Sequence, residues 1–368
     1  MKKINSRVLG TALVLGLWLV LALMLMLGSR NSVSESERRP LAQAPEISGE
    51  AVLSGSFMKD FEEFTLDQFP FRDGFRRVKS LFHFYALRQK DNHNIYIQDG
   101  FAAVQEYPLN TESVHHALDR FQGIYDRYLK EQGSAVTMAI VPDKGYYLGL
   151  QAGQLRMDYE AMFTAFREGM PWANHLDLTA SLSAQDYYRT DTHWRQERLL
   201  NAAKVICEGL GVTAPGAEDF TVTALERPFY GVYYGQAALP MEPDTMYLME
   251  SALLENCTVY DHESGETSAV YNLNLLDSRD LYDVYLSGSR SLLTIHNPAG
   301  IPGKELIVFR DSFGSSMVPL ILGDYETVTV VDIRYLSSAF LDRFVDFHGQ
   351  DVLFLYSTLV LNNSNTIK

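Results

Sequence analysis

Cysteine is scarce in this sequence. Its 368 residues contain only two, Cys207 and Cys257. Two cysteines exclude a disulfide framework and also exclude a zinc site built from cysteine ligands. Two buried thiols and a single bridge are both compatible with this count, so the sequence leaves the two alternatives open.

Basic residues are also in short supply, with 31 Lys and Arg against 46 Asp and Glu and a net charge of −15. A surface of that sign repels phosphate backbones, which excludes nucleic acid as a partner. The histidines do not follow the His-Glu-x-x-His spacing of a helical zinc site. The adjacent His115 and His116 point in different directions on one predicted helix. We therefore predict no catalytic metal and no cofactor.

Charge is missing altogether from one stretch near the start, residues 8–28, which follows Lys2, Lys3 and Arg7. Its 21 residues match the roughly 20 that cross a bilayer. We predict an uncleaved transmembrane anchor at residues 1–30, with its basic end in the cytoplasm and the rest of the chain outside. A cleaved signal peptide is the alternative, although the stretch lacks a good small-x-small cleavage site.

Two segments separate this anchor from the rest of the chain. Residues 31–56 are polar and show no apolar period, so we interpret them as a linker. Residues 57–88 are rich in aromatic side chains that recur at helical spacing on both sides of Pro70. This second segment is predicted to form amphipathic helices.

The remaining chain opens with a hairpin around Asp99-Gly100 and a helix over 111–131 that Thr111 caps. Strands and helices then alternate. The predicted strands are residues 135–142, 174–178, 291–296, 305–309, 327–333 and 351–356. The predicted helices are residues 158–169, 195–210, 312–322 and 337–347. This order predicts one α/β domain over 57–368 with a mostly parallel sheet and helices on both faces, and residues 213–275 are interpreted as an insertion.

A carboxylate and an imidazole lie two positions apart in "DTHW", where Asp191 precedes His193 and Trp194 follows it. A polar turn that Asp191 caps is one explanation of this spacing. A catalytic base held by its orienting acid is the other, and it requires a nucleophile elsewhere in the chain.

Ser312 is a candidate for that nucleophile, because the segment "ELIVFRDSFGSSMVPLILG" reads as a strand, a tight turn and a helix. The turn places Ser312 at the carboxyl end of a strand, where active sites of open α/β sheets collect. A helix cap formed by Asp311 or Ser312 is the alternative. The two motifs together predict that His193 activates Ser312 while Asp191 orients the imidazole.

The sequence resembles the bacterial DHHW family and the related AlgJ/AlgX group of SGNH-hydrolase-like proteins. The resemblance runs in order through "SESERRPLAQAP", "DQFPFRD", "DTHW", "DLYDVYLSG", "FRDSFGSSMVPLI", "VVDIRYL" and "DVLFLY". It implies an exported, three-layer α/β domain of the SGNH-hydrolase type. It also implies O-acetylation of a polysaccharide, with acetyl groups supplied by a membrane-bound acyltransferase.

Residue by residue, the resemblance assigns Ser312 as nucleophile, His193 as base and Asp191 as orienting acid. Two positions depart from the pattern. Arg310 stands where many members have glycine before Asp311, and Thr192 stands where the family motif has a second histidine.

Four further residues are candidates for substrate binding. Lys144 and the pair Arg334–Tyr335 each follow a predicted strand at the same edge of the sheet as Ser312. Trp194 is a candidate platform for a sugar ring. The alternatives are an exposed loop lysine for Lys144, a structural ion pair for Arg334 and core packing for Trp194.

Two functions are compatible with these residues. The first is acyl transfer, in which Ser312 takes an acetyl group and passes it to a polysaccharide hydroxyl or to water; the sequence does not separate transferase from esterase. The second is a non-catalytic cell-envelope scaffold or carbohydrate-binding protein with a vestigial triad.

The anchor predicts a specific topology. Protease added to intact cells should remove the domain that follows residue 30, because that domain faces outward, whereas a cytoplasmic control protein should survive. Protection of the domain until the membrane is permeabilised would contradict the predicted orientation.

Overall fold

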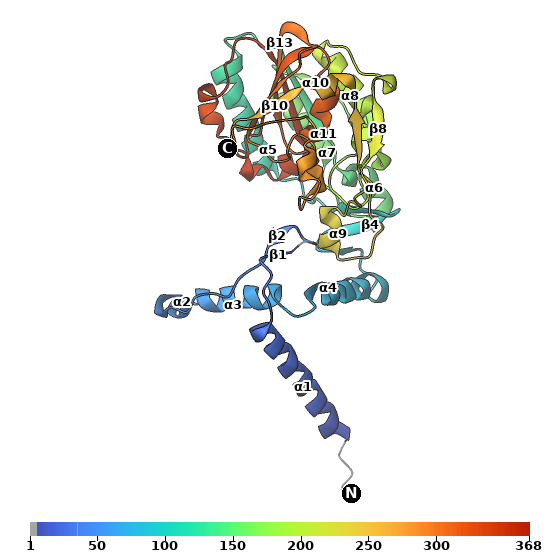
Figure 1. The fold of residues 1–368 in the computed structure, drawn as a ribbon, viewed down its shortest axis with the longest axis vertical. Helices are drawn as coiled ribbons and strands as arrows, with labels where there is room; N and C mark the ends of the chain where they lie inside the picture. Colours follow the sequence, from blue (N-terminus) through green and yellow to red (C-terminus); the bar gives the residue numbers. More distant parts are fainter. Residues whose placement is uncertain (1–5, 35) are drawn as a thin grey trace. The chain divides into compact units, whose positions relative to one another are not determined.

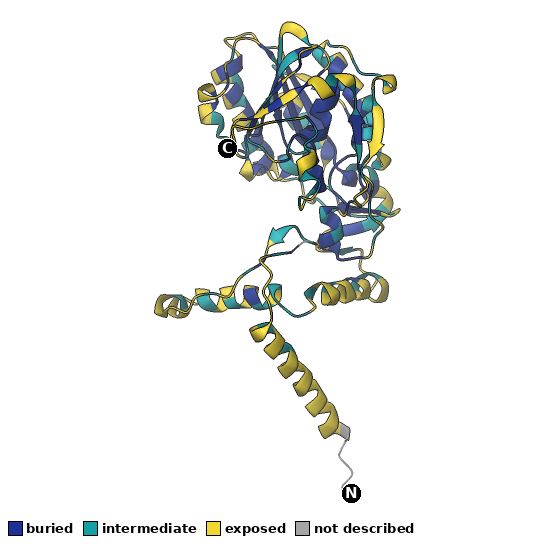
Figure 2. Ribbon diagram, in the orientation of Figure 1, coloured by how far each residue is buried: buried dark blue, intermediate teal, exposed yellow. Residues whose placement is uncertain are grey.

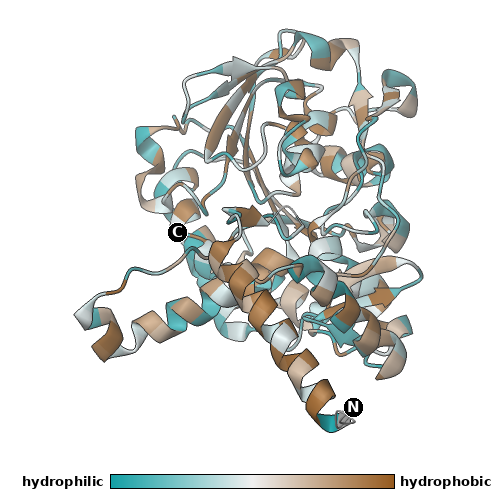
Figure 3. Cartoon of the chain, turned by 60° about the horizontal axis from the view of Figure 1, so that its bottom comes forward, coloured by the Kyte–Doolittle hydropathy of each residue, from teal (hydrophilic) through white to brown (hydrophobic). Residues whose placement is uncertain are grey.

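Helix α1 (Ser6–Leu27) occupies the uncharged stretch of the sequence in the computed structural model, which describes residues 6–34 and 36–368. The helix is apolar along most of its length (Figure 3). Residues Arg7–Leu27 are long and apolar enough to cross a membrane, and none of that window is buried within the protein. These properties fit a membrane anchor or a signal sequence. Lys2 and Lys3, which entered the orientation argument, lie outside the described residues.

The chain divides into two units. The N-terminal unit comprises Met1–Asn92 and Tyr234–Pro240, and the α/β unit comprises His93–Tyr233 and Met241–Lys368. Residues 57–92, which were predicted to belong to the α/β domain, group by their contacts with the N-terminal unit.

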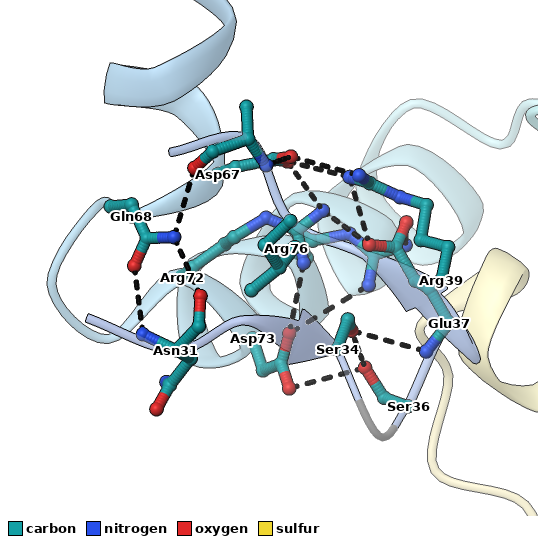
Figure 4. A network of polar contacts seen from close by, with 12 residues as sticks. Asn31, Ser34, Ser36, Glu37, Arg39, Asp67, Gln68, Arg72, Asp73 and Arg76 are labelled. Atoms are coloured by element: carbon teal, nitrogen blue, oxygen red, sulfur yellow. Dashed lines mark hydrogen bonds and ion pairs between the residues drawn. The ribbon is translucent and has the colours of Figure 1, made fainter. Parts of the chain in front are cut away.

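The N-terminal unit contains short helices and a small ladder. Its elements after α1 are β1 (Val33–Ser34), β2 (Arg39–Pro40), α2 (Gly49–Ser54), α3 (Ser56–Asp67), α4 (Arg72–Leu81), the π-helical turn η1 (Phe82–Ala86) and β3 (Asp91–Asn92). The segment interpreted as a linker, 31–56, therefore contains the paired strands β1 and β2 and helix α2. An ion-pair network holds the unit together, with Arg39 donating to both carboxylate oxygens of Asp67 at 2.8 and 2.6 Å (Figure 4).

A sheet that includes β10 and β13 forms the centre of the α/β unit (Figure 1). It has eight strands in the order β11-β10-β12-β14-β13-β15-β6-β7. Its strands are β6 (Val136–Val141), β7 (Asn174–Leu176), β10 (Thr258–Asp261), β11 (Thr267–Ser268), β12 (Leu292–His296), β13 (Ile301–Arg310), β14 (Tyr325–Val331) and β15 (Asp351–Ser357). The five strands from β14 to β7 in this order run parallel, and β12 pairs antiparallel with β14. The predicted α/β fold with a mostly parallel sheet is confirmed.

Side chains alternate between the two faces of this sheet, and each face carries its own hydrophobic core. In β13, Leu306 and Val308 point to one core, while Ile307 and Phe309 point to the other. The strands are consequently buried on both sides, as Figure 2 shows by their dark colour. Both faces of a parallel sheet are apolar and must be shielded from water, so helices cover both of them. The predicted three layers result.

The remaining α-helices are α5 (Thr111–Ile124), α6 (Lys144–Ala152), α7 (Tyr159–Gly169), α8 (Leu200–Leu210), α9 (Val232–Ala237), α10 (Ala252–Asn256), α11 (Gly314–Met317) and α12 (Thr358–Asn362). Among these helices, α5, α7 and α8 match predicted ones. The side chain of Asn110, not Thr111, caps α5 by accepting the Ser113 N–H at 3.1 Å. Helices α6, α9, α10 and α12 were not predicted.

Two of the predicted helices are wrong in type. The helix expected over 312–322 begins as α11 and tightens into the 3₁₀ turn η9 (Val318–Ile321), where Pro319 cannot donate a helical hydrogen bond. The helix expected over 337–347 is the 3₁₀ segment η10 (Ser338–Arg343), which is interrupted at Phe340.

The remaining predictions for the α/β unit concern its hairpin, its insertion and its cysteines. The hairpin is confirmed as β4 (Ile95–Gln98) and β5 (Phe101–Val104), with positive φ at both Asp99 and Gly100. Within the predicted insertion, 213–275, β8 (Thr221–Ala224) pairs with β9 (Tyr247–Glu250), but β10 and β11 from the same range belong to the central sheet. Both cysteines are buried free thiols, which settles the question of a bridge.

The packing of the central strands predicts where the stability of the α/β unit is most sensitive to loss of a side chain. Phe354 in β15 is fully buried and packs on Phe121 and Phe309 at centroid distances of 4.9 and 4.8 Å. Phe354→Ala should lower the free energy of unfolding by about 3–5 kcal/mol. The control is Phe344→Ala, at a position that is 53% exposed, where about 0.5 kcal/mol or less is expected. Equal losses in urea unfolding of the two variants would contradict the assignment of the core.

Candidate active site

Asp191 and His193 lie on one short loop whose ends are held together by a bridge between Tyr187 and Trp194. Oδ1 of Asp191 accepts both the backbone N–H of His193 at 3.1 Å and its ring Nδ1 at 2.6 Å. Asp191 is fully buried, and His193 is 7% exposed. A carboxylate held this way fixes the orientation of the imidazole and favours a proton on Nδ1.

A second segment of the chain supports Asp191 from behind. Its Oδ2 accepts the backbone N–H of Val232 at 2.8 Å. This approach requires glycine at position 231, because a Cβ there would lie 2.3 Å from the Thr190 carbonyl oxygen and from Cβ of Asp191. With both its oxygens engaged, Asp191 has little freedom to rotate away from His193.

Ser312 lies in the turn that leaves β13, and Asp311 anchors that turn. Oδ1 of Asp311 accepts the Phe313 N–H at 3.0 Å, while Oδ2 accepts the N–H and the hydroxyl of Ser357 at 2.7 and 2.6 Å. Asp311 and Phe313 are buried, whereas Ser312 between them is partly exposed. The turn therefore presents the Ser312 hydroxyl and buries its neighbours.

The structure brings the two motifs together as the sequence predicted. Oγ of Ser312 lies 2.8 Å from Nε2 of His193, and Asp191 bonds the opposite nitrogen of the same ring. With a proton on Nδ1, the other nitrogen is free to accept the serine proton. The three groups form a continuous chain of hydrogen bonds from a buried carboxylate to a partly exposed hydroxyl.

The face of the imidazole is covered by Tyr282, a residue to which the sequence argument gave no role. The two rings stack 3.9 Å apart and 10° from parallel. The Tyr282 hydroxyl bonds Ser316 at 2.7 Å, and burial raises its pKa above the usual value. Tyr282 belongs to the "DLYDVYLSG" stretch, so the resemblance marked the segment, but nothing in its spacing indicated contact with His193.

Trp194 does not form a platform for sugar. Its side chain is fully buried, and the indole N–H donates to the Phe313 carbonyl oxygen at 3.1 Å and to the Ser316 hydroxyl at 2.9 Å. Core packing is therefore the correct alternative, since a buried ring cannot stack on a ligand in solvent. Its contacts instead brace the turn that carries Ser312.

Lys144 is also buried, at 2% exposure, and is not the exposed loop residue of the alternative interpretation. Its ammonium group donates to the Tyr188 carbonyl oxygen at 2.8 Å and lies 4.9 Å from the centre of the Tyr233 ring. Burial lowers its pKa to about 7, and Asp191 is the strongest of the nearby charges that oppose this shift. Lys144 thus supports the start of the loop that carries Asp191.

Arg334 forms a structural ion pair, which is the alternative given for it above. Its guanidinium makes two bonds to Asp332, at 2.9 and 2.6 Å, and also lies over the ring of Tyr335. Burial opposes the charge of Arg334, but the bonds to Asp332 more than offset it and raise its pKa. Tyr335 is 52% exposed.

Arg310, the departure from the family pattern, is fully buried. It donates to the Gly288 carbonyl oxygen at 3.0 Å and to the Asp311 carbonyl oxygen at 3.3 Å. Burial lowers its pKa. Gly314 makes room for it, because a Cβ there would meet Cβ of Arg310 at 2.7 Å. Arg310 thus lies within the fold and ties the turn of Ser312 to the loop at Gly288.

The backbone N–H groups around Ser312 differ in their availability. Phe313 donates to Asp311 Oδ1, Gly314 to the Asp311 carbonyl oxygen and Ser315 to the Ser312 carbonyl oxygen. Within the described residues we find no acceptor for the N–H of Ser312. Across residues 6–34 and 36–368, no three His, Cys, Asp or Glu side chains gather in an arrangement that could hold a metal ion.

Comparison with known proteins places this site in context. The family model described as DHHW protein matches residues 175–331, a range that includes Asp191, His193 and Ser312. The predicted resemblance to the DHHW family is confirmed. No curated protein matches the sequence.

Solved structures share the fold at low sequence identity. A DHHW family protein from Eubacterium siraeum matches with a TM-score of 0.58 and 19% identity, over 75% of this chain and 95% of that chain. Bacillus cereus PatB1 matches with a TM-score of 0.60 and 18% identity, over 74% and 98%. PatB1 with a sulfonyl adduct matches with a TM-score of 0.57 and 18% identity, over 73% and 95%. At these identities the comparisons establish the fold.

Burial of Lys144 predicts how stability depends on pH. Its pKa is about 7 in the folded protein against an ordinary value of 10.5. The unfolded chain therefore binds more protons between these values, and stability rises with pH across that window. From about pH 7 to about pH 9 the parent should gain up to about 2 kcal/mol relative to Lys144→Met.

Urea unfolding across this pH range measures the difference. The matched control is Lys130→Met, which removes a lysine whose side chain is 58% exposed and should follow the parent at every pH. If Lys144→Met also follows the parent, the lysine does not carry the shifted pKa.

Proposed function

We propose that this protein is an acyl-transfer enzyme in which Ser312 is the nucleophile, His193 the general base and Asp191 the residue that orients the imidazole. The observation that carries the proposal is the pair of bonds on the His193 ring, 2.8 Å to the Ser312 hydroxyl and 2.6 Å to the Asp191 carboxylate. A serine hydroxyl becomes a useful nucleophile when a correctly oriented base takes its proton.

In the first step, Oγ of Ser312 attacks the carbonyl carbon of an acetyl donor while its proton moves to Nε2 of His193. Asp191 stabilises the resulting imidazolium, and the Tyr282 ring lies against the face of that cation. In this proposal the N–H of Ser312 donates to the developing oxyanion. Collapse of the intermediate transfers the proton from His193 to the leaving group and leaves an acetyl ester on Ser312.

In the second step, His193 takes a proton from an incoming hydroxyl, which attacks the acetyl ester and releases Ser312. A polysaccharide hydroxyl as acceptor makes the enzyme an O-acetyltransferase, and water as acceptor makes it an esterase. The motifs shared with the AlgJ/AlgX group support acetyl as the transferred group and polysaccharide as the acceptor. The half-exposed Tyr335 is a candidate contact for a sugar.

The proposal includes the placement of the protein in the cell. Helix α1 is proposed as an uncleaved, single-pass membrane anchor, with the α/β unit on the extracytoplasmic side. An exported enzyme lacks cytoplasmic acetyl donors, so a membrane-bound acyltransferase is the proposed source of acetyl groups. The length and composition of α1 support this placement.

Substitution of the three residues tests the chemistry. Ser312→Ala and His193→Ala should each reduce turnover of a chromogenic acetyl ester by on the order of 10⁴-fold or more, because triad members act as a unit. Asp191→Asn should lose on the order of 10⁴-fold while retaining the fold, because the wrong ring nitrogen then faces Ser312. Ser268→Ala, on the edge strand β11, is the matched control and should keep parental activity.

A sulfonyl fluoride provides a second measurement, because it reacts covalently with an activated serine hydroxyl. Mass spectrometry should find the adduct on the peptide that contains Ser312 in the parent and in Ser268→Ala, and on no peptide of Ser312→Ala. The scaffold alternative predicts the opposite pattern: no ester turnover and no adduct in the parent, together with saturable polysaccharide binding that all four variants retain.

A further inference from the structure

A row of apolar side chains lies on the outside of the N-terminal unit. Phe75, Val78, Phe82 and Tyr85 follow one another at spacings of three and four residues, which places them on one side of α4 and η1, and Phe71 directly precedes α4. Each is between 52% and 75% exposed. We call this set the outer stripe.

The opposite side of the same helix is fixed inside the N-terminal unit. Arg76 donates to the Gly235 carbonyl oxygen at 2.9 Å, and the Ser80 hydroxyl donates to that of Ala237 at 2.6 Å. Glu37 pairs with Arg72 and, at 3.0 Å, with Arg76 (Figure 4). Because these contacts hold the inner side, α4 cannot turn to bury the outer stripe without breaking them.

Beyond the exposed Asp73, which lies between Phe71 and Phe75, the residues along the outer stripe carry one sign of charge. Residues 74–90 contain no Asp or Glu, although the whole chain has a net charge of −15. They contain five basic residues: Arg76, Arg77, Lys79, Arg88 and Lys90. All of these except Arg76 are exposed. A helix side with aromatic and basic residues is complementary to the surface of a lipid bilayer that contains anionic headgroups. The interior of such a bilayer is apolar and its surface is negative.

We infer that the outer stripe lies in the interfacial layer of a membrane that contains anionic lipid. The aromatic rings would enter the boundary between headgroups and acyl chains, to a depth of roughly 5–10 Å, while the basic side chains contact lipid phosphates. The same unit contains α1, the helix able to span a bilayer. This inference rests on the proposed membrane anchoring and is independent of the proposed chemistry.

The test uses the full chain, one copy per nanodisc, in discs of phosphatidylcholine with phosphatidylglycerol. An environment-sensitive fluorophore is attached to Phe75→Cys or Phe82→Cys, and the unsubstituted chain reports any labelling of the buried Cys207 and Cys257. Leu15→Cys in α1 reports insertion of the anchor. Glu168→Cys, exposed on α7, reports a position in water.

Labels at 75 and 82 should be quenched by lipid-borne nitroxides several-fold more strongly than the label at 168. If the label at 15 is quenched while those at 75 and 82 behave like 168, the outer stripe is not in the membrane although the anchor is. If none is quenched, both the anchor and the inference fail. If the labels at 75 and 82 change their fluorescence only in discs that hold two copies, the stripe is an interface between chains, and this result would overturn the inference.

Charge provides an independent arm of the test. Lys79→Glu/Arg88→Glu/Lys90→Glu should weaken quenching at position 75 several-fold, whereas Lys130→Glu/Arg167→Glu/Lys204→Glu should not, although the net charge changes equally. In the parent, raising the salt from about 0.1 M to about 1 M shortens the screening length from about 10 Å to about 3 Å and should also weaken quenching. Quenching that is unaffected by both salt and charge reversal would contradict the role of anionic lipid.

Discussion

The buried carboxylate of Asp311 is the interaction on which the site depends. One of its oxygens accepts the Phe313 N–H, and the other accepts the N–H and hydroxyl of Ser357. These bonds tie the end of β13 to the end of β15, which are parallel neighbours in the sheet. A buried charge is tolerated when its acceptor sites are filled in this way. The turn between the bonds has one partly exposed member, Ser312, and its position follows from the sheet itself.

The base is positioned by a different principle. Asp191 and His193 lie on a loop, and a loop holds its shape only where other groups fill its polar and apolar contacts. Val232 supplies an N–H to Asp191, Lys144 bonds the carbonyl at the start of the loop, and Tyr282 covers the imidazole face. These supports come from separate parts of the α/β unit. The hydrogen bond between His193 and Ser312 therefore depends on how those parts pack together.

Arg310 illustrates how a departure from a family pattern can be absorbed. The residue before Asp311 is glycine in many members, and an arginine there suggests a damaged turn. In the structure the side chain extends into the interior, where it reaches the Gly288 carbonyl oxygen, and Gly314 leaves space for it. These bonds and Asp332, 3.9 Å away, offset part of the cost of burying the guanidinium, although burial still lowers the pKa of Arg310. The bulk of Arg310 is therefore directed away from the Ser312 hydroxyl.

Much of the architecture was determined by the sequence itself, because apolar runs, the Asp99-Gly100 turn and the Asp191, His193 and Ser312 motifs are local signals. The position of Ser312 directly after a predicted strand also placed it at the edge where active sites of open α/β sheets collect. Only the tertiary structure decided that Lys144 and Trp194 are buried, that Tyr282 stacks on His193 and that one side of α4 stays exposed. Each of these outcomes depends on contacts between residues about 40 to 160 positions apart, and a local sequence pattern does not specify which distant partner fills a given space.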